Sequence, residues 1–179
     1  SRGTDGHAAW STSKSKSPEY ARISWTLDSG RVVVVHRLMA HGIAERGCGE
    51  CAMSFHIRDL RLDDVPALAR LHVQTFTETH HGGRSGGPSY ELRERQWRDA
   101  FAAADGSWFC FVVEDDHGEL VAFAKGTPHD GGVPGFAGEL NKIYALQRVH
   151  RQGVGRLLLC HVARRFIERG VTSMLLFGD

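Results

Sequence analysis

The stretch RVHRQGVGRLLL, residues 148–159, sets two glycines directly before an apolar, arginine-bearing segment with the pattern of a helix. A β-like run, LNKIYAL at residues 140–146, comes just before it. A strand, a glycine turn and a helix in this order direct several free backbone N–H groups and the positive end of a helix dipole at one point. The stretch therefore predicts a binding site for a phosphate-bearing ligand.

Three kinds of glycine turn compete as explanations of this stretch. A Rossmann loop has the pattern G-x-G-x-x-G, but the chain has Leu158 where the third glycine should stand. A Walker loop has the pattern G-x-x-x-x-G-K-[ST], which does not occur in the chain. The third explanation is a turn whose glycines bind nothing and only let the helix approach the sheet closely.

The segments around the turn predict a mixed sheet flanked by helices. Hydrophobic period and turn residues indicate a strand, two helices, three strands, a helix and a strand in chain order. A hairpin turning at 115–118 requires antiparallel pairing, whereas the strand–helix–strand unit at 139–177 requires a parallel crossover. The fold class is therefore α/β of the α+β kind. The predicted segments are 54–61, 63–76, 90–104, 107–114, 119–127, 139–146, 154–169 and 171–177.

The N-terminal part of the chain does not share this pattern. Residues 1–20 are rich in Ser, Gly and Lys and show no periodicity, so we expect disorder there. Met53 opens a stretch that looks like the natural beginning of a domain. We therefore divide the chain into an N-terminal extension at 1–52 and a domain at 53–179.

Composition limits the partners that the chain can take. The 22 Lys and Arg residues nearly balance the 21 Asp and Glu residues, so no positive field for binding nucleic acid follows. The longest apolar runs fall well short of the roughly 20 residues that span a bilayer. No leader with a cleavage site opens the chain. We therefore expect a soluble, cytoplasmic protein with neither a membrane partner nor a nucleic-acid partner.

The cysteines and histidines raise the question of a metal site. Cys48 and Cys51, with His36 and His41 upstream, could supply four zinc ligands. Their spacing fits no common zinc finger, and no second pair of ligands follows. The other explanation is an irregular Gly/Cys segment, and we expect no metal.

The six residues HRQGVG, 150–155, resemble the signature of the GNAT-type N-acetyltransferases, [QR]-x-x-G-x-[GA], at every position but the first. The resemblance extends over residues 55–177, and that family uses the same order of elements. It implies a mostly antiparallel sheet with a V-shaped splay between the fourth and fifth strands. It also implies a C-terminally truncated fold, because relatives continue with an Asn-bearing loop, a helix and a final hairpin.

The resemblance implies acetyl-CoA as the donor and a primary amine of a small molecule or protein as the acceptor. The pyrophosphate of acetyl-CoA is expected on the turn made of His150, Arg151, Gln152, Gly153, Val154, Gly155 and Arg156. Glycines suit this turn because no Cβ blocks the approach of the phosphates. The pantetheine arm is expected in the splay, paired with Tyr144, Ala145 and Leu146. The alternative for these three residues is a plain core strand.

Acetyl transfer to nitrogen needs a neutral amine, and a lysine-type ammonium has a pKa of about 10.4. The resemblance to the histone-acetylating branch implies a general base at Glu139, where the strand before the turn begins. Asn141 and Tyr144, on the same strand, could help to polarise a water or the thioester carbonyl. The alternative for Glu139 is a solvated carboxylate at the end of a strand.

Two classes of function are compatible with these features. The first is an N-acetyltransferase, with His80, His81 and Arg84 on the loop that lines the acceptor site in relatives. The second is a non-catalytic acyl-CoA-binding module or an inactive remnant. The reason for the second is that the family's thiolate-protonating Tyr lies in the part that this chain lacks, so that only a residue such as Tyr144 could replace it.

The strand at 171–177 is expected to have an open edge, since the final hairpin of the family would cover it. A row of unpaired backbone groups attracts another chain. We therefore expect a homodimer in which RVVVVHRL, residues 31–38, covers this edge on a second copy. That segment can itself form a hairpin with ISWTL, residues 23–27.

Overall fold

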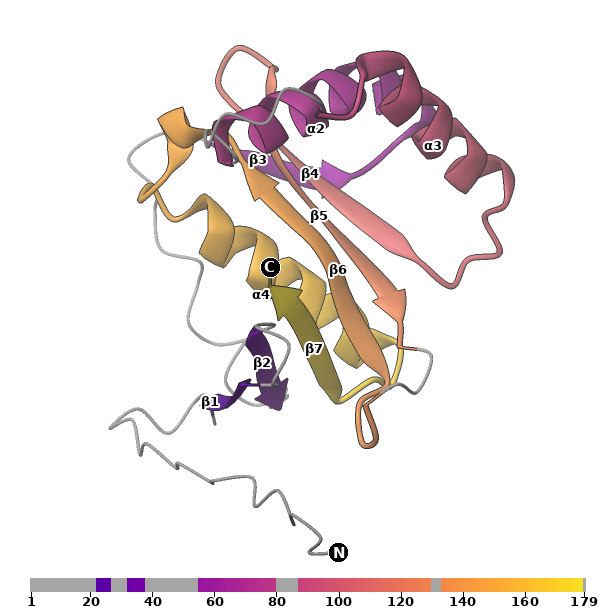
Figure 1. Ribbon diagram of the computed structural model, residues 1–179, viewed down its shortest axis with the longest axis vertical. Helices are drawn as coiled ribbons and strands as arrows, with labels where there is room; N and C mark the ends of the chain where they lie inside the picture. Colours follow the sequence, from indigo (N-terminus) through magenta and orange to yellow (C-terminus); the bar gives the residue numbers. More distant parts are fainter. Residues whose placement is uncertain (1–21, 27–31, 38–54, 80–86, 130–132, 179) are drawn as a thin grey trace, which may run out of the picture.

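The computed structural model describes residues 22–26, 32–37, 55–79, 87–129 and 133–178. These residues form one seven-stranded sheet in the order β1-β2-β7-β6-β5-β4-β3, with α-helices packed against it (Figure 1). The strands are β1 Arg22–Thr26, β2 Val32–Arg37, β3 His56–Asp59, β4 Phe109–Glu114, β5 Leu120–Pro128, β6 Gly138–Ala145 and β7 Ser173–Gly178. The helices are α2 Val65–Thr79, α3 Tyr90–Ala102 and α4 Val154–Glu168, with 3-10 turns at Leu62–Asp64 and Gln147–Val149.

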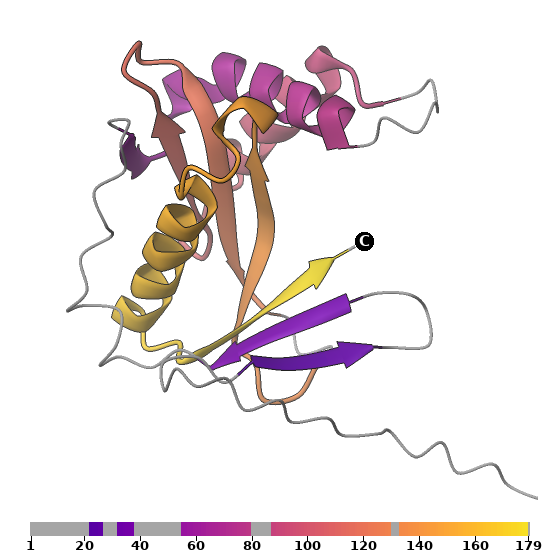
Figure 2. The ribbon, with the colours of Figure 1, turned by 90° about the vertical axis from the view of Figure 1, so that its left-hand side faces the viewer.

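The helices lie on both faces of the sheet (Figures 1 and 2). On one face, His72 of α2 and Trp97 of α3 pack edge-on against the fully buried Phe123 of β5. On the other face, Phe166 of α4 packs against Phe109 of β4. No helix in the described part of the chain is long and apolar enough to cross a membrane. The order of elements from β3 to β7 and the mixed, mostly antiparallel sheet confirm the predicted fold class.

Strands β6 and β7 diverge after a short contact, which confirms the predicted splay. They pair in parallel only at Gly138 with Met174 and at Glu139 with Leu175. Beyond Glu139, β6 continues to Ala145 paired, among the described strands, with β5 alone, while β6 and β7 open into a V (Figure 2).

A β-bulge in β6 lies two residues beyond this last contact. The register with β5 steps from Leu140 opposite Gly126 to Lys142 opposite Lys125, so Asn141 is the extra residue. A bulge bends its strand and increases the local twist. The position of this bulge therefore gives a physical reason for the divergence of β6 from β7.

The edge of β7 that was predicted to be open is paired within the same chain. Strand β2 runs antiparallel to β7 from Arg37 opposite Ser173 to Val32 opposite Gly178, and β1 pairs with β2 in turn. The predicted hairpin is thus confirmed. The expectation that β7 lacks a partner until a second copy supplies one is wrong, because the N-terminal hairpin of this chain adds two strands there.

Strand β3 is shorter than the predicted 54–61, whereas α2 begins two residues later than the predicted 63–76 and ends three residues later. Strand β3 ends at Asp59 and α2 begins at Val65, because a 3-10 turn lies between them. In that turn, Asp64 Oδ2 accepts the Arg61 N–H at 2.8 Å and Arg58 Nη1 at 2.6 Å. The Arg58 guanidinium holds the pKa of Asp64 below its usual value. This acidic turn stops the strand and starts the helix.

Candidate active site

The glycine turn before α4 leaves the first backbone N–H groups of the helix accessible. Gly153 is the N-cap of α4 with φ 85°, a left-handed conformation that favours glycine, and within the described part of the chain no side-chain hydrogen bond caps the helix there. The first N–H groups of a helix have no partner within the helix. A Cβ added at Gly155 would have no atom within 4 Å. The start of the helix is therefore open to a ligand.

Arginines surround this turn. Arg151 adopts a positive φ of 62°, which is uncommon for a residue with a Cβ, and Arg156 is exposed in the first turn of α4. Arg148 donates to Asp115 Oδ2 at 2.8 Å and so ties the turn to the β4–β5 hairpin. The helix dipole and these exposed guanidinium groups have the same sign, which favours an anion at this point.

His150 differs from the signature and uses its side chain as well as its backbone. Its Nε2 lies 2.9 Å from the carbonyl oxygen of Ala145, which can only accept, so Nε2 carries the proton. The ring thereby links the turn to the end of β6. The backbone N–H of Leu146 donates to Val121 of β5 at 3.0 Å. By alternation, the backbone groups of Ala145 point to the opposite side, toward the splay.

Glu139 lies on the α2/α3 face of the sheet, in a hydrogen-bonded group. A Cβ at the preceding Gly138 would meet Phe166 of α4, so Glu139 points to the other face. Its Oε1 accepts from Asn141 Nδ2 at 3.0 Å, and its Oε2 lies 3.5 Å from His129 Nδ1. The Glu139 side chain keeps 20% of its surface exposed, so water can reach it.

Sequence reasoning missed His129, which packs against the carboxylate of Glu139. Its side chain is only 2% exposed. Its Nε2 accepts the backbone N–H of Val133 at 2.9 Å, so in the neutral ring the proton is on Nδ1, facing Glu139. The sequence gives no signal for this contact, because the pairing of Thr127 with Glu139, which brings His129 close, is known only from the structure.

Tyr144 belongs to an aromatic group on the same face as Glu139. Its ring stacks on Phe123 with centroids 5.4 Å apart and lies 5.2 Å from His72. His72 is buried and accepts a hydrogen bond from Trp97 Nε1 at 3.4 Å. Burial lowers the pKa of His72 to about 3, so this ring is neutral at physiological pH. The group holds Tyr144 in a defined orientation beside the splay.

Other predicted site residues lie outside the described ranges: His80, His81 and Arg84 of the acceptor loop, and His41, Cys48 and Cys51 of the zinc hypothesis. His36 is in β2. Among the residues that the structure describes, no group of His, Cys, Asp and Glu side chains could hold a metal ion.

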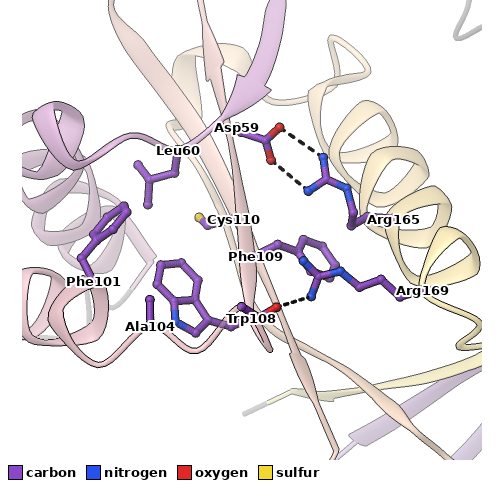
Figure 3. Close-up of a pocket in the computed structure, with 10 residues that line it drawn as sticks. Asp59, Leu60, Phe101, Ala104, Trp108, Phe109, Cys110, Arg165 and Arg169 are labelled. Carbon is purple, nitrogen blue, oxygen red and sulfur yellow. Dashed lines mark hydrogen bonds and ion pairs between the residues drawn. The ribbon is translucent and has the colours of Figure 1, made fainter.

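A separate hollow lies between α4 and the β3–β4 edge (Figure 3). Arg165 donates to both carboxylate oxygens of Asp59 at 3.1 Å. Arg169 donates to the carbonyl oxygens of Ser107 at 2.8 Å and Gly106 at 3.1 Å. Both guanidinium groups therefore bind other parts of the protein, and the two arginines attach α4 to the sheet edge. This hollow is separate from the glycine turn.

Sequence comparison places these features in a known group. The profile of the Acetyltransferase (GNAT) family matches residues 66–178, which is more than half of the chain. A protein of Bacillus subtilis (strain 168), described as the uncharacterized N-acetyltransferase YuaI, is 29% identical over 125 residues. That match covers 68% of this chain and 69% of the relative.

Structural comparison agrees on the fold. An aminoglycoside N-acetyltransferase, AAC(6')-Iy, solved in complex with CoA, has a TM-score of 0.56 at 17% identity over 72% of this chain and 79% of that one. A glucosamine N-acetyltransferase region of a fungal multi-domain β-N-acetylglucosaminidase has a TM-score of 0.54 at 20% identity over 71% of this chain. This chain spans 14% of that multi-domain protein. With the family profile, the splayed sheet and the glycine turn in agreement, the chain belongs to the GNAT family of acetyltransferases.

Proposed function

We propose that this chain is an N-acetyltransferase that moves an acetyl group from acetyl-CoA to a primary amine. The observation that carries the proposal is the uncapped, open glycine turn beside the divergence of β6 and β7. The turn offers backbone donors to a pyrophosphate, and the divergence leaves one side of β6 without a partner among the strands that the structure describes. Together they suit a long ligand with a phosphate-bearing end.

Different residues of this chain would bind different parts of acetyl-CoA. The turn from His150 to Arg156 would hold the pyrophosphate, and a Cβ at Gly155 would fill the space in front of it. Tyr144, Ala145 and Leu146 would border the pantetheine arm, with Ala145 directing its backbone groups toward the splay. When bound, acetyl-CoA supplies a thioester that an amine nitrogen can attack.

Glu139 would take the proton from the acceptor amine, directly or through a water. Asn141 and His129 hold its two carboxylate oxygens from opposite sides, so the carboxylate keeps one orientation. The Tyr144 hydroxyl, on the same face, can donate a proton to a leaving thiolate. His80, His81 and Arg84 are proposed to border the acceptor. The homodimer expected from an open β7 edge loses its physical reason, since β2 occupies that edge.

The test measures binding and turnover separately. Gly155→Leu should weaken acetyl-CoA binding by calorimetry more than tenfold, about 1.4 kcal/mol. The helix should not suffer, because Leu is a better helix former than Gly by about 0.8 kcal/mol. Gly155 is preferable to Gly153 for this purpose, because the positive φ of Gly153 strains any replacement. Unchanged affinity in Gly155→Leu would show that the turn is not the donor site.

Glu139→Gln should lower kcat, measured as CoA release with a panel of amines, by roughly 10²–10⁴-fold while the acetyl-CoA affinity stays nearly intact. The second candidate function, an acyl-CoA-binding module, predicts a different result. Such a module would show thermal stabilisation by CoA without any turnover in the unchanged protein.

A further inference from the structure

Two lysines face each other on neighbouring strands in the middle of the sheet. Lys125 of β5 is directly opposite Lys142 of β6 in the register. Both side chains are on the face that carries Glu139, because Thr127, the strand partner of Glu139, is two residues from Lys125. Like charges directly opposite one another destabilise a sheet. The presence of two lysines at opposite positions therefore calls for a functional explanation.

The fold holds Lys125 in place with aromatic rings and not with a carboxylate. Its Nζ lies 4.7 Å from the ring centre of Trp108 and 5.5 Å from that of Trp97. Among the described residues, no Asp or Glu forms an ion pair with it. Burial lowers the pKa of Lys125, which reflects a charge without full solvation or a compensating partner.

Lys142 is connected to the candidate base. Its Nζ donates to Asn141 Oδ1 at 3.0 Å, and Asn141 in turn donates to Glu139 at 3.0 Å. Burial lowers the pKa of Lys142, and the nearby charges of Lys125 and Arg93 lower it further. Lys142 is therefore a half-buried cation a short distance along β6 from the group that would receive the amine proton.

Arg93 of α3 adds a third positive charge above the same face. Its Nη1 donates to Gln96 Oε1 at 2.9 Å, but its Nε is buried and has no hydrogen-bond partner among the described residues. Arg93 also lies close enough to lower the pKa of both Lys142 and His72. A buried N–H donor without a partner costs free energy, which an acceptor on a ligand would recover.

We propose that Lys125, Lys142 and Arg93 bind an anionic group, a carboxylate or a phosphate, that the acceptor carries beside its amine. An anion here would relieve the repulsion between the lysines and give Arg93 Nε an acceptor. The same cations would repel an ammonium and favour the neutral amine that attacks the thioester. Acceptors that carry only positive charges would be disfavoured. This proposal rests on the proposed function, because it assigns the substrate class of the same site.

The kinetic test compares two pairs of acceptors, and in each pair one member carries an anion that the other lacks. One pair is an amino acid and its carboxamide, and the other is an amino sugar and its 6-phosphate. The anionic member of at least one pair should have a kcat/KM at least about tenfold higher, which corresponds to about 1.4 kcal/mol. The pair that shows this preference identifies carboxylate or phosphate as the group bound.

Lys142→Met should bring this ratio toward one. The matched control is Arg164→Met, which removes the same charge from an exposed position of α4 on the opposite face of the sheet and should keep the wild-type ratio. Equal or better use of the neutral members by the unchanged protein would overturn the proposal.

A binding measurement keeps the test independent of turnover. The indole N–H signals of Trp97 and Trp108 are followed by NMR during titration with inorganic phosphate or with acetate. They should shift saturably in the unchanged protein and in Arg164→Met, and this response should be lost in Lys142→Met. Indole signals that do not respond in the unchanged protein would overturn the anion site even if acetyl transfer occurs. Saturable shifts without acetylation of any amine would support the anion site and contradict the proposed function.

Discussion

His129 uses its two ring nitrogens on two different partners, the backbone of Val133 and the carboxylate of Glu139. Asn and Gln can separate these contacts, since the Asn amide nitrogen lies near the position of Nδ1 and the Gln amide oxygen near that of Nε2. We expect His129→Gln to keep the Val133 contact and the melting temperature, but to lower kcat on the order of tenfold, because a hydrogen bond to a charged group contributes about 1.5–3 kcal/mol.

His129→Asn should show the reverse, with kcat within about twofold of the unchanged enzyme and a lower melting temperature from one lost hydrogen bond. The measurements are steady-state kinetics and thermal unfolding on both variants. A loss of kcat that follows the loss of stability in both variants would mean that His129 only closes its loop and does not orient Glu139.

His72 makes a testable contribution to stability against pH. Its pKa in the folded protein is about 3, below the ordinary value of 6.5. Between these values the unfolded chain binds a proton that the folded chain does not, so the free energy of unfolding falls as the pH falls from 6.5 toward 3. The slope from this residue is at most about 1.4 kcal/mol per pH unit.

Urea unfolding at a series of pH values should show this slope, and His72→Gln should flatten it while leaving an acceptor for Trp97. His117→Gln, in the exposed β4–β5 turn, serves as the control and should keep the wild-type slope. The same slope in His72→Gln as in the unchanged protein would mean that other groups cause the acid sensitivity.

At the scale of elements, the bulge in β6 is expected to cause the splay. Pairing with β7 ends at Glu139, and the extra residue Asn141 comes two positions later. Deleting Asn141 should restore a regular ladder with β5, straighten β6 and extend its pairing with β7. Acetyl-CoA affinity should then fall by more than about tenfold, or 1.4 kcal/mol. Asn141→Ala keeps the residue count and therefore the bulge, so its affinity should stay close to that of the unchanged protein by calorimetry.

At the scale of the whole molecule, the hairpin of β1 and β2 is expected to prevent association through β7. Proline lacks the N–H that an interior strand needs. Val34→Pro, in the middle of β2, should release β7 and produce concentration-dependent self-association by light scattering. Arg22→Pro changes the first residue of the outermost strand, where proline is tolerated, and should scatter light like the unchanged chain, which we expect to be a monomer. A dimeric unchanged chain would contradict the protective role of β2.

Much of the fold could be predicted because its signals are local. Gly153 adopts a backbone conformation that few other residues adopt. The sequence indicates this turn locally, because a second glycine, Gly155, follows two positions later. Helix α4 was recognisable from its period, and the β4–β5 hairpin from its turn residues. Glu139 was placed at the start of its strand from the resemblance and the order of elements. Its role as a base stays a prediction.

The amino-acid sequence by itself determined the order of the elements, the glycine turn and the family. Only the tertiary structure decided which residues stand opposite one another: His129 beside Glu139, Lys125 against Lys142, and β2 along β7. The physical reason is that a strand pattern specifies which residues share a face but not the register with a distant strand. That register depends on turns, bulges and packing that act together, because a shift of one residue moves every side chain to the other face.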